Sequence, residues 1–200
     1  MALDPIIQSF LRDPRVYQAF LDAGWYPERE FDLTQWQQQY LEYGYVWNPI
    51  VETVLRSFGG LTVHPPTITP RVYAPSAILF DPGFVDFEIS HESLLSDETL
   101  IQKALWPIGN YGEQGILFID EEASIYLDGG TFLIDHGSMS THAADALILA
   151  IRYPKLLRGR VWWQPNGVDG AMAPRAIETA TVVDAHWASN KIQSMNKPAD

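Results

Sequence analysis

The sequence predicts an α+β domain in which N-terminal helices pack on a mainly antiparallel sheet that a further helix closes, with a C-terminal extension. Two observations lead to this fold class. The first third of the 200 residues repeats helix start and stop signals, and the middle of the chain alternates short apolar runs with polar turns. With 46% hydrophobic residues and seven Trp, the chain is able to bury a substantial core.

Helices are expected first along the chain, where capping residues and glycines bracket apolar stripes. The predicted helices cover residues 5–12, 14–23, 33–43 and 49–58. Asp13 and Asn48 suit the N-cap because each precedes a proline at the first helical position. Gly24 and Gly59 stop the two clearest helices, and Gly60 allows a tight reversal or the close approach of another backbone.

Strands and turns are expected from residue 61 onward. The predicted strands cover residues 61–64, 77–80, 84–89, 115–120, 124–130 and 131–134. Polar turns separate the last three apolar runs, which favours an antiparallel meander. Two further helices are expected, one over residues 97–105 with Ser96 as its N-cap and one over residues 140–151.

The charge pattern gives the best internal boundary. Between Arg71 and Arg152 the chain has 13 acidic residues and one basic residue, Lys103, whereas basic residues outnumber acidic ones from Arg152 onward. We therefore expect a domain over residues 1–153 and a C-terminal extension of unknown role over residues 154–200, packed on that domain.

Composition excludes several classes of function. Without Cys the chain has no disulfide, thiol nucleophile or zinc ribbon. The formal net charge of -12 disfavours direct binding to nucleic acid, because the phosphate backbone would be repelled. The sequence shows neither an apolar run of about 20 residues nor a secretory pattern, so we expect a cytoplasmic protein with no membrane partner.

No arrangement of residues supports catalysis or a cofactor. His136 and His142, with Asp135 and Asp145 nearby, form the one local cluster to weigh as a metal site, but a neutral His at a loop or helix start is commoner than a ligand. The acidic run over residues 120–122 suits an ordinary hydrated turn between strands. We therefore expect no enzyme activity, no metal and no cofactor.

The acidic middle of the chain has two explanations that the sequence leaves open. It is either a solvated surface or a surface complementary to a basic partner, where charge accelerates encounter and selects the partner. The candidate binding residues are Asp81, Asp86, Glu88, Glu92, Asp97, Glu98, Glu113, Asp120, Glu121 and Glu122. Whether these carboxylates share one face is not visible in the sequence.

Several short motifs follow one another in order between residues 15 and 151. They are Ala23-Gly24-Trp25 with Pro27 and Arg29, Phe58-Gly59-Gly60-Leu61, Trp106-Pro107-Ile108-Gly109, and Phe118-Ile119-Asp120 followed by Ile125-Tyr126. Their order and spacing resemble the third subfamily of the SUKH superfamily of immunity proteins. Glu28 departs from this pattern, since a small residue, usually Gly, is expected before Arg29.

The resemblance implies an α+β fold and the role of a cytoplasmic antidote, a protein encoded beside a polymorphic toxin that binds the toxin and blocks it. It further implies a toxin that is a nuclease or a deaminase, with a basic surface that the acidic stretch would match. The motif residues would specify the scaffold and not contact the toxin. An adaptor or regulatory protein of the same fold with no toxin partner is the alternative, and a homodimer is also left open.

Overall fold

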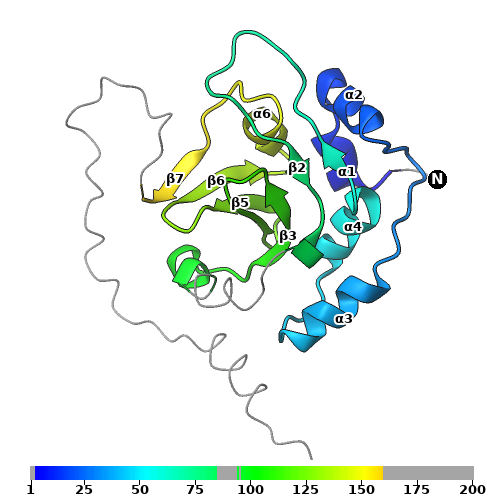
Figure 1. Ribbon diagram of the computed structural model, residues 1–200, viewed down its shortest axis with the longest axis vertical. Helices are drawn as coiled ribbons and strands as arrows, with labels where there is room; N and C mark the ends of the chain where they lie inside the picture. The colour runs from blue at the N-terminus through cyan, green and yellow to red at the C-terminus, as the bar shows by residue number, and fades with distance from the viewer. Residues whose placement is uncertain (1–2, 85–93, 95, 160–200) are drawn as a thin grey trace, which may run out of the picture. The chain divides into compact units, whose positions relative to one another are not determined.

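The computed structural model describes residues 3–84, 94 and 96–159 (Figure 1). The chain divides into two compact units, Met1–Val161 and Trp162–Asp200, and all described residues belong to the first. This unit combines N-terminal helices with a seven-stranded antiparallel sheet, which confirms the predicted α+β class. The described helices include none that is long and apolar enough to cross a membrane.

The helices before the sheet lie where the sequence predicts them. They are α1 (Pro5–Phe10), α2 (Pro14–Asp22), α3 (Thr34–Glu42) and α4 (Pro49–Phe58). The side chains of Asp13 and Asn48 cap α2 and α4 by accepting a hydrogen bond from the backbone N–H two residues further on. At α3, Asp32 Oδ1 accepts from the backbone N–H and the hydroxyl of Thr34. Local capping therefore sets these boundaries.

The glycines after α2 and α4 have different roles. Gly24 has a φ of +93° and is the left-handed residue that the sequence predicts. After α4 the left-handed residue is Gly60, at +74°, and not Gly59. A Cβ on Gly59 would lie 2.6 Å from Cζ3 of Trp36, so this position requires the absence of a side chain. The N–H of Gly60 donates to the carbonyl of Phe80 at 2.7 Å, which ties the end of α4 to the sheet.

The sheet is a meander in which each strand pairs antiparallel with the next along the chain. The strands are β1 (Thr62–Val63), β2 (Ile78–Leu79), β3 (Trp106–Tyr111), β4 (Ile116–Ile119), β5 (Ser124–Asp128), β6 (Leu133–Ser138) and β7 (Lys155–Arg158). The predicted meander over β4, β5 and β6 is confirmed. The sheet also includes β3 and β7, which the sequence reasoning did not assign.

Three predicted elements differ from the structure. Of the strand expected over residues 84–89, only Phe84 is described, and it ends a 3₁₀ helix, η1 (Pro82–Phe84); the rest lies outside the described residues. Residues 94 and 96–101 are helical, so Ser96 lies inside this helix and is not its cap. The closing helix α6 (Ala143–Leu147) is shorter than predicted, and Ala150 already has a φ of +52°.

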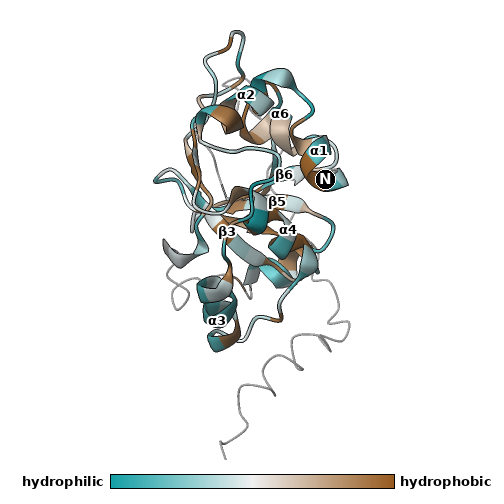
Figure 2. Cartoon of the chain, turned by 90° about the vertical axis from the view of Figure 1, so that its right-hand side faces the viewer, coloured by the Kyte–Doolittle hydropathy of each residue, from teal (hydrophilic) through white to brown (hydrophobic). Residues whose placement is uncertain are grey.

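The core lies between the helices and the sheet. The ring of Phe58 on α4 lies 4.5 Å from that of Phe20 on α2 and 5.3 Å from that of Phe80, just after β2. On α3, the buried Tyr40 donates its hydroxyl to the carbonyl of Pro107 in β3. Hydrophobic and hydrophilic bands alternate along the helices in Figure 2, as expected for elements with one buried side. These contacts hold the helical layer against the strands.

Candidate protein-interaction surface

Among the described residues, the predicted acidic residues of the strand turns do not lie together. Glu113 lies in the turn between β3 and β4, whereas Glu121 and Glu122 lie in the turn between β4 and β5. Consecutive turns of an antiparallel meander lie at opposite ends of the shared strand, so these carboxylates are separated by the length of β4. Asp86, Glu88 and Glu92 lie outside the described residues.

Three of the predicted contact residues are buried. The side chains of Asp97, Glu98 and Asp120 have no exposed surface. Asp120 accepts hydrogen bonds from the Tyr126 hydroxyl at 3.0 Å and from Lys103 Nζ at 2.7 Å, and it also caps its own turn by accepting two backbone N–H groups. Burial removes these three residues from the set that a partner is able to contact directly.

Asp97 belongs to a cluster that we call the Arg158 cluster, formed by the buried Asp97 and Asp128 and the half-buried Arg158. Arg158 Nη2 donates to Asp97 at 3.0 Å and to Asp128 at 3.2 Å. Burial and then the neighbouring Asp128 raise the pKa of Asp97 to about 6, and Arg158 opposes this shift. Arg158 lies on β7, so residues after the predicted boundary at 153 take part in the described domain.

The motif residues at the start of the chain hold the scaffold. Trp25 is buried, packs edge-on against Tyr17 and donates from Nε1 to the hydroxyl of Ser57 at 3.0 Å. The guanidinium of Arg29 donates to the carbonyls of Ser57, at 2.9 Å, and Gly59, at 2.6 Å. Arg29 therefore binds the carbonyls at the end of α4, which helix geometry leaves unpaired.

The two histidines that the sequence singled out lie in different environments. His136, on β6, is 3% exposed, and neither of its ring nitrogens has a hydrogen-bond partner among the described residues. Burial lowers the pKa of His136 to about 3. His142 is exposed, with Nδ1 3.9 Å from Asp145. Within the described ranges, no group of three or more potential ligands is placed to hold a metal ion.

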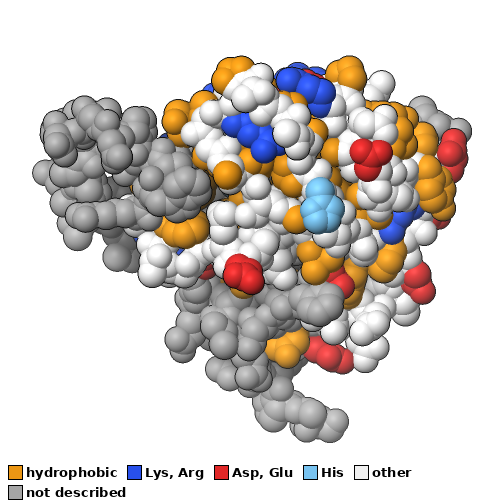
Figure 3. Space-filling view, turned by 45° about the horizontal axis from the view of Figure 1, so that its top comes forward, with side chains coloured by type: hydrophobic (Ala, Val, Ile, Leu, Met, Phe, Trp, Pro, Cys, Tyr) orange, Lys and Arg blue, Asp and Glu red, His pale blue; other side chains and the backbone are white. Residues whose placement is uncertain are grey.

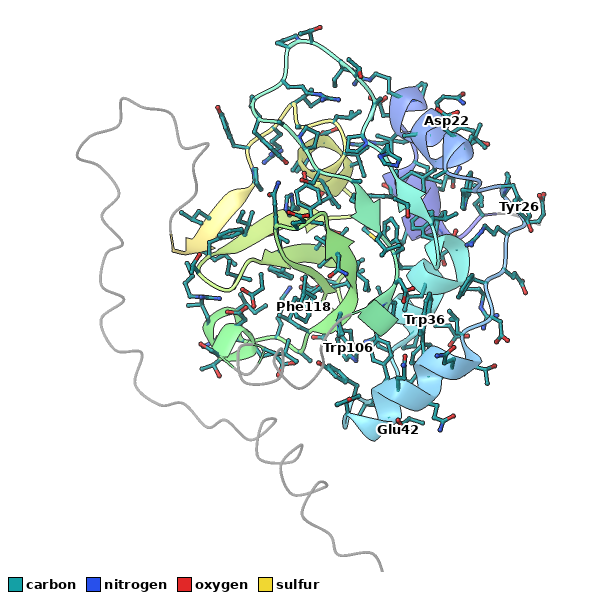
Figure 4. The ribbon with its side chains drawn as sticks, in the orientation of Figure 1. Asp22, Tyr26, Trp36, Glu42, Trp106 and Phe118 are labelled. Atoms are coloured by element: carbon teal, nitrogen blue, oxygen red, sulfur yellow. The ribbon has the colours of Figure 1, made fainter. Side chains whose placement is uncertain are left out.

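Exposed carboxylates are concentrated on the helical layer, which the sequence reasoning passed over. We call Asp22, Glu28, Glu30, Asp32 and Glu42 the acidic helical face, and all five are exposed. Figure 4 shows Asp22 and Glu42 on the outer side of α2 and α3, with Tyr26 on the connection between these helices. The signal was present in the sequence, because Arg29 is the only basic residue between Arg15 and Arg56.

Hydrophobic side chains are exposed on the same layer. Tyr26 is 54% exposed, Leu41 65% and Val46 76%. Figure 3 shows separate acidic side chains among hydrophobic ones on the right-hand side of the domain, with basic side chains also visible there. Large apolar side chains surrounded by charge are typical of protein interfaces, whose centres are apolar and whose rims are polar.

Two pockets open among the described residues of the helical layer, each with a volume of about 390 Å³. The first lies between α1, the α2–α3 connection and α4, and its lining includes Pro27, Glu28 and Arg29. The second lies between α3 and η1, and its lining includes Asp32 and Asp81. Asp81, a predicted binding residue, thus meets the acidic helical face at this second pocket.

Together, these features define an α+β domain in which, among the described residues, five exposed carboxylates and the three most exposed large apolar side chains lie on one helical layer. A family model described as SUKH-3 immunity protein matches residues 12–150, which is more than half of the chain. The chain therefore belongs to the SUKH-3 immunity protein family, as its motifs indicate. No curated protein and no solved structure matches the chain.

Proposed function

We propose that this chain binds and neutralises a cognate polymorphic toxin that acts on nucleic acid, either a nuclease or a deaminase, through the acidic helical face. Membership of an immunity protein family supports neutralisation by binding, without catalysis. The observation that carries the choice of surface is the run of exposed carboxylates from Asp22 to Glu42. Five exposed carboxylates lie at the end of α2, on the α2–α3 connection and on α3, and Arg29, the one basic residue between Arg15 and Arg56, is bound to backbone carbonyls.

The charge of the helical layer suits the surface of a protein that handles nucleic acid. Such proteins bind phosphates with Lys and Arg, and a carboxylate surface competes for the same cations. Complementary charge raises association rates and disfavours other partners, and salt screens it over about 8 Å at physiological ionic strength. We therefore expect toxin binding in the cytoplasm that is fast and that weakens as salt is added.

The exposed apolar side chains supply binding energy that exposed charges alone do not. Rim charges change association rates more than affinity, whereas buried aromatic and aliphatic side chains carry most of the binding energy. Tyr26, Leu41 and Val46 are exposed and lie on the layer that carries the acidic helical face. We propose that these three side chains become buried in the complex.

The test is co-expression and binding with the polypeptide encoded beside the gene of this chain. We expect protection of the host cell, and binding that a Glu28→Lys, Glu30→Lys double variant weakens about tenfold or more at low salt. Glu113→Lys is the control, since it reverses one charge in a turn of the sheet, a change of +2 compared with +4 in the double variant. Absence of both association and protection would refute the proposal and favour the adaptor alternative. Loss of binding only in Glu113→Lys would move the interface to the strand turns.

A further inference from the structure

The second pocket of the helical layer has a lining rich in hydrogen-bond acceptors. We call it the aspartate pocket, and its lining includes Phe31, Asp32, Trp36, Gln39, Asp81 and Gly83. Its volume of about 390 Å³ lies in the range of pockets that hold small ligands or single side chains. No Lys, Arg or His is among the described residues that line it, so the two carboxylates give it a formal charge of about -2.

Acceptor atoms in this pocket lack donors. Asp32 and Asp81 each use Oδ1, on the backbone N–H and hydroxyl of Thr34 and on the N–H of Gly83. Their Oδ2 atoms have no partner among the described residues. Gln39 Oε1 is buried and likewise has no hydrogen-bond partner there. Buried acceptors in folded proteins are almost always satisfied, which leaves Gln39 Oε1 in want of a donor. Asp32 is exposed and Asp81 half-buried, so water reaches their free oxygens, and a group with several N–H donors is able to replace that water and reach the Gln39 oxygen as well.

The wall of the pocket is aromatic and held in place. The rings of Phe31 and Trp36 stack with centroids 4.7 Å apart and an interplanar angle of 21°. The guanidinium carbon of Arg29 lies 5.4 Å from the centroid of Phe31. Figure 4 places Trp36 on the inner side of α3, toward the sheet. Such a wall suits the methylene stem of a long side chain whose charged end reaches the carboxylates.

We infer that the aspartate pocket binds an arginine side chain of the toxin, as an anchor of the interface. A guanidinium is planar, permanently charged and weakly hydrated, and it carries five N–H donors for carboxylate and amide oxygens. A lysine has three donors on a strongly hydrated point charge, which fits an aromatic-walled pocket less well. This inference rests on the proposed function for the identity of the partner, whereas the pocket's preference for arginine is testable by itself.

The direct test uses N-acetyl-arginine N-methylamide as the probe and the full chain as the receptor. We expect binding in the millimolar range, because a single small side chain offers few contacts. Binding should shift the indole N–H resonance of Trp36, assigned by its absence in Trp36→Phe. The citrulline analogue, which is uncharged, should bind at least about threefold more weakly. Equal binding of both analogues, or no shift of Trp36 at saturation, would overturn the inference, and tighter binding of the lysine analogue would replace arginine by lysine.

Two variants locate the probe. Asp81→Asn and Asp32→Asn each remove one charge while keeping an oxygen that accepts the same backbone N–H, so the fold should persist. Each should weaken arginine amide binding about threefold or more, whereas the matched control Glu113→Gln should leave it unchanged. Unchanged binding in both pocket variants would contradict the assignment. Gly83→Ala offers a steric check, because a Cβ there would lie 3.0 Å from Asp81 Oδ1 and 3.2 Å from Trp36 Nε1.

The toxin complex separates this inference from the proposed function. If the toxin binds and Asp81→Asn raises its Kd about tenfold, both stand. If the toxin binds equally well to Asp81→Asn, Asp32→Asn and the unchanged chain, the anchor is refuted while neutralisation by binding stands. If no toxin binds, the proposed function fails and the anchoring role fails with it.

Discussion

Replacing His136 by Leu should make the domain less sensitive to acid. His136 is buried and neutral in the folded state, with a pKa of about 3, whereas an unfolded chain binds a proton near the ordinary value of 6.5. Below pH 6.5 the unfolded state therefore binds a proton that the folded state does not. The free energy of unfolding falls as pH falls through this window, until the folded pKa near 3 is reached.

The size of the change in the free energy of unfolding depends on how far the pH falls below 6.5. Between about pH 7.5 and about pH 5, the linkage removes about 2 kcal/mol from the free energy of unfolding, at about 1.4 kcal/mol per pH unit below 6.5. His136→Leu lacks the titrating group, so the stability difference between variant and parent should shift in favour of the variant by this amount. At neutral pH the variant should be at least as stable, because the replaced nitrogens have no hydrogen-bond partner among the described residues.

Other groups also titrate in this range, and the comparison removes their effect. Asp97 works in the opposite direction, because its folded pKa of about 6 exceeds the ordinary value of 3.8. Its contribution to stability is fully present below about pH 3.8 and is lost as pH rises through 6. Parent and variant share Asp97, so its effect cancels in their difference.

The assay is urea unfolding followed by Trp fluorescence, on parent and His136→Leu, at about pH 7.5, 6 and 5. A free energy difference that stays constant over these pH values would refute the reasoning, since it would mean that His136 titrates alike in the folded and unfolded states. His142→Leu is the matched control, because this exposed histidine is not enclosed by the domain. The pH dependence measured for His136→Leu should exceed that measured for His142→Leu, because only His136 is enclosed by the domain.

Further substitutions test the remaining structural assignments. Asp97→Asn should remove a group that burial holds near a pKa of 6, so that stability relative to the parent rises by about 2–3 kcal/mol between about pH 4 and pH 7.5 in urea unfolding. Arg29→Met should lower the free energy of unfolding by about 2–3 kcal/mol, because the carbonyls of Ser57 and Gly59 lose their hydrogen-bond donor. The control Arg15→Met, at an exposed position, should change the free energy of unfolding by less than about 1 kcal/mol. Gly59→Ala should lower the free energy of unfolding by about 2–3 kcal/mol, because its Cβ would clash with the Leu55 carbonyl oxygen and the Trp36 ring. Gly130→Ala, with open space around it and a φ of +75°, should lower it by about 1 kcal/mol. A similar melting temperature for both variants would contradict this packing.

Much of the fold was predictable because the ends of its helices are set by contacts between residues that are close in sequence. Asp13, Asn48 and Gly24 cap or stop helices through bonds that span a few residues, so sequence spacing suffices to find them. Strand β3 was not assigned because Pro107 and Gly109 are poor strand residues, and the sheet accommodates them by a register shift between these two positions. The residues of β7 carry no local strand signal. This segment becomes a strand by pairing with β6, and that pairing is not visible in the local sequence.

The candidate site was less predictable because burial depends on tertiary contacts. Asp120, Glu121 and Glu122 are adjacent in sequence, yet Asp120 is enclosed while both glutamates are exposed. The enclosed carboxylate accepts backbone N–H groups two and four residues on, a pattern that an Asp at the start of a turn often shows. The acidic helical face was visible in the sequence as a run of acids, but its exposure was not.

The Arg158 cluster sets a minimum length for a folding fragment. The family match ends at residue 150, before β7 begins. A fragment that stopped there would enclose Asp97 and Asp128 without their guanidinium, and uncompensated buried charge is strongly destabilising. The shortest autonomous unit therefore extends at least through Arg158, so a truncation meant to isolate the antidote activity should end after this strand and not at the limit of the recognisable motifs.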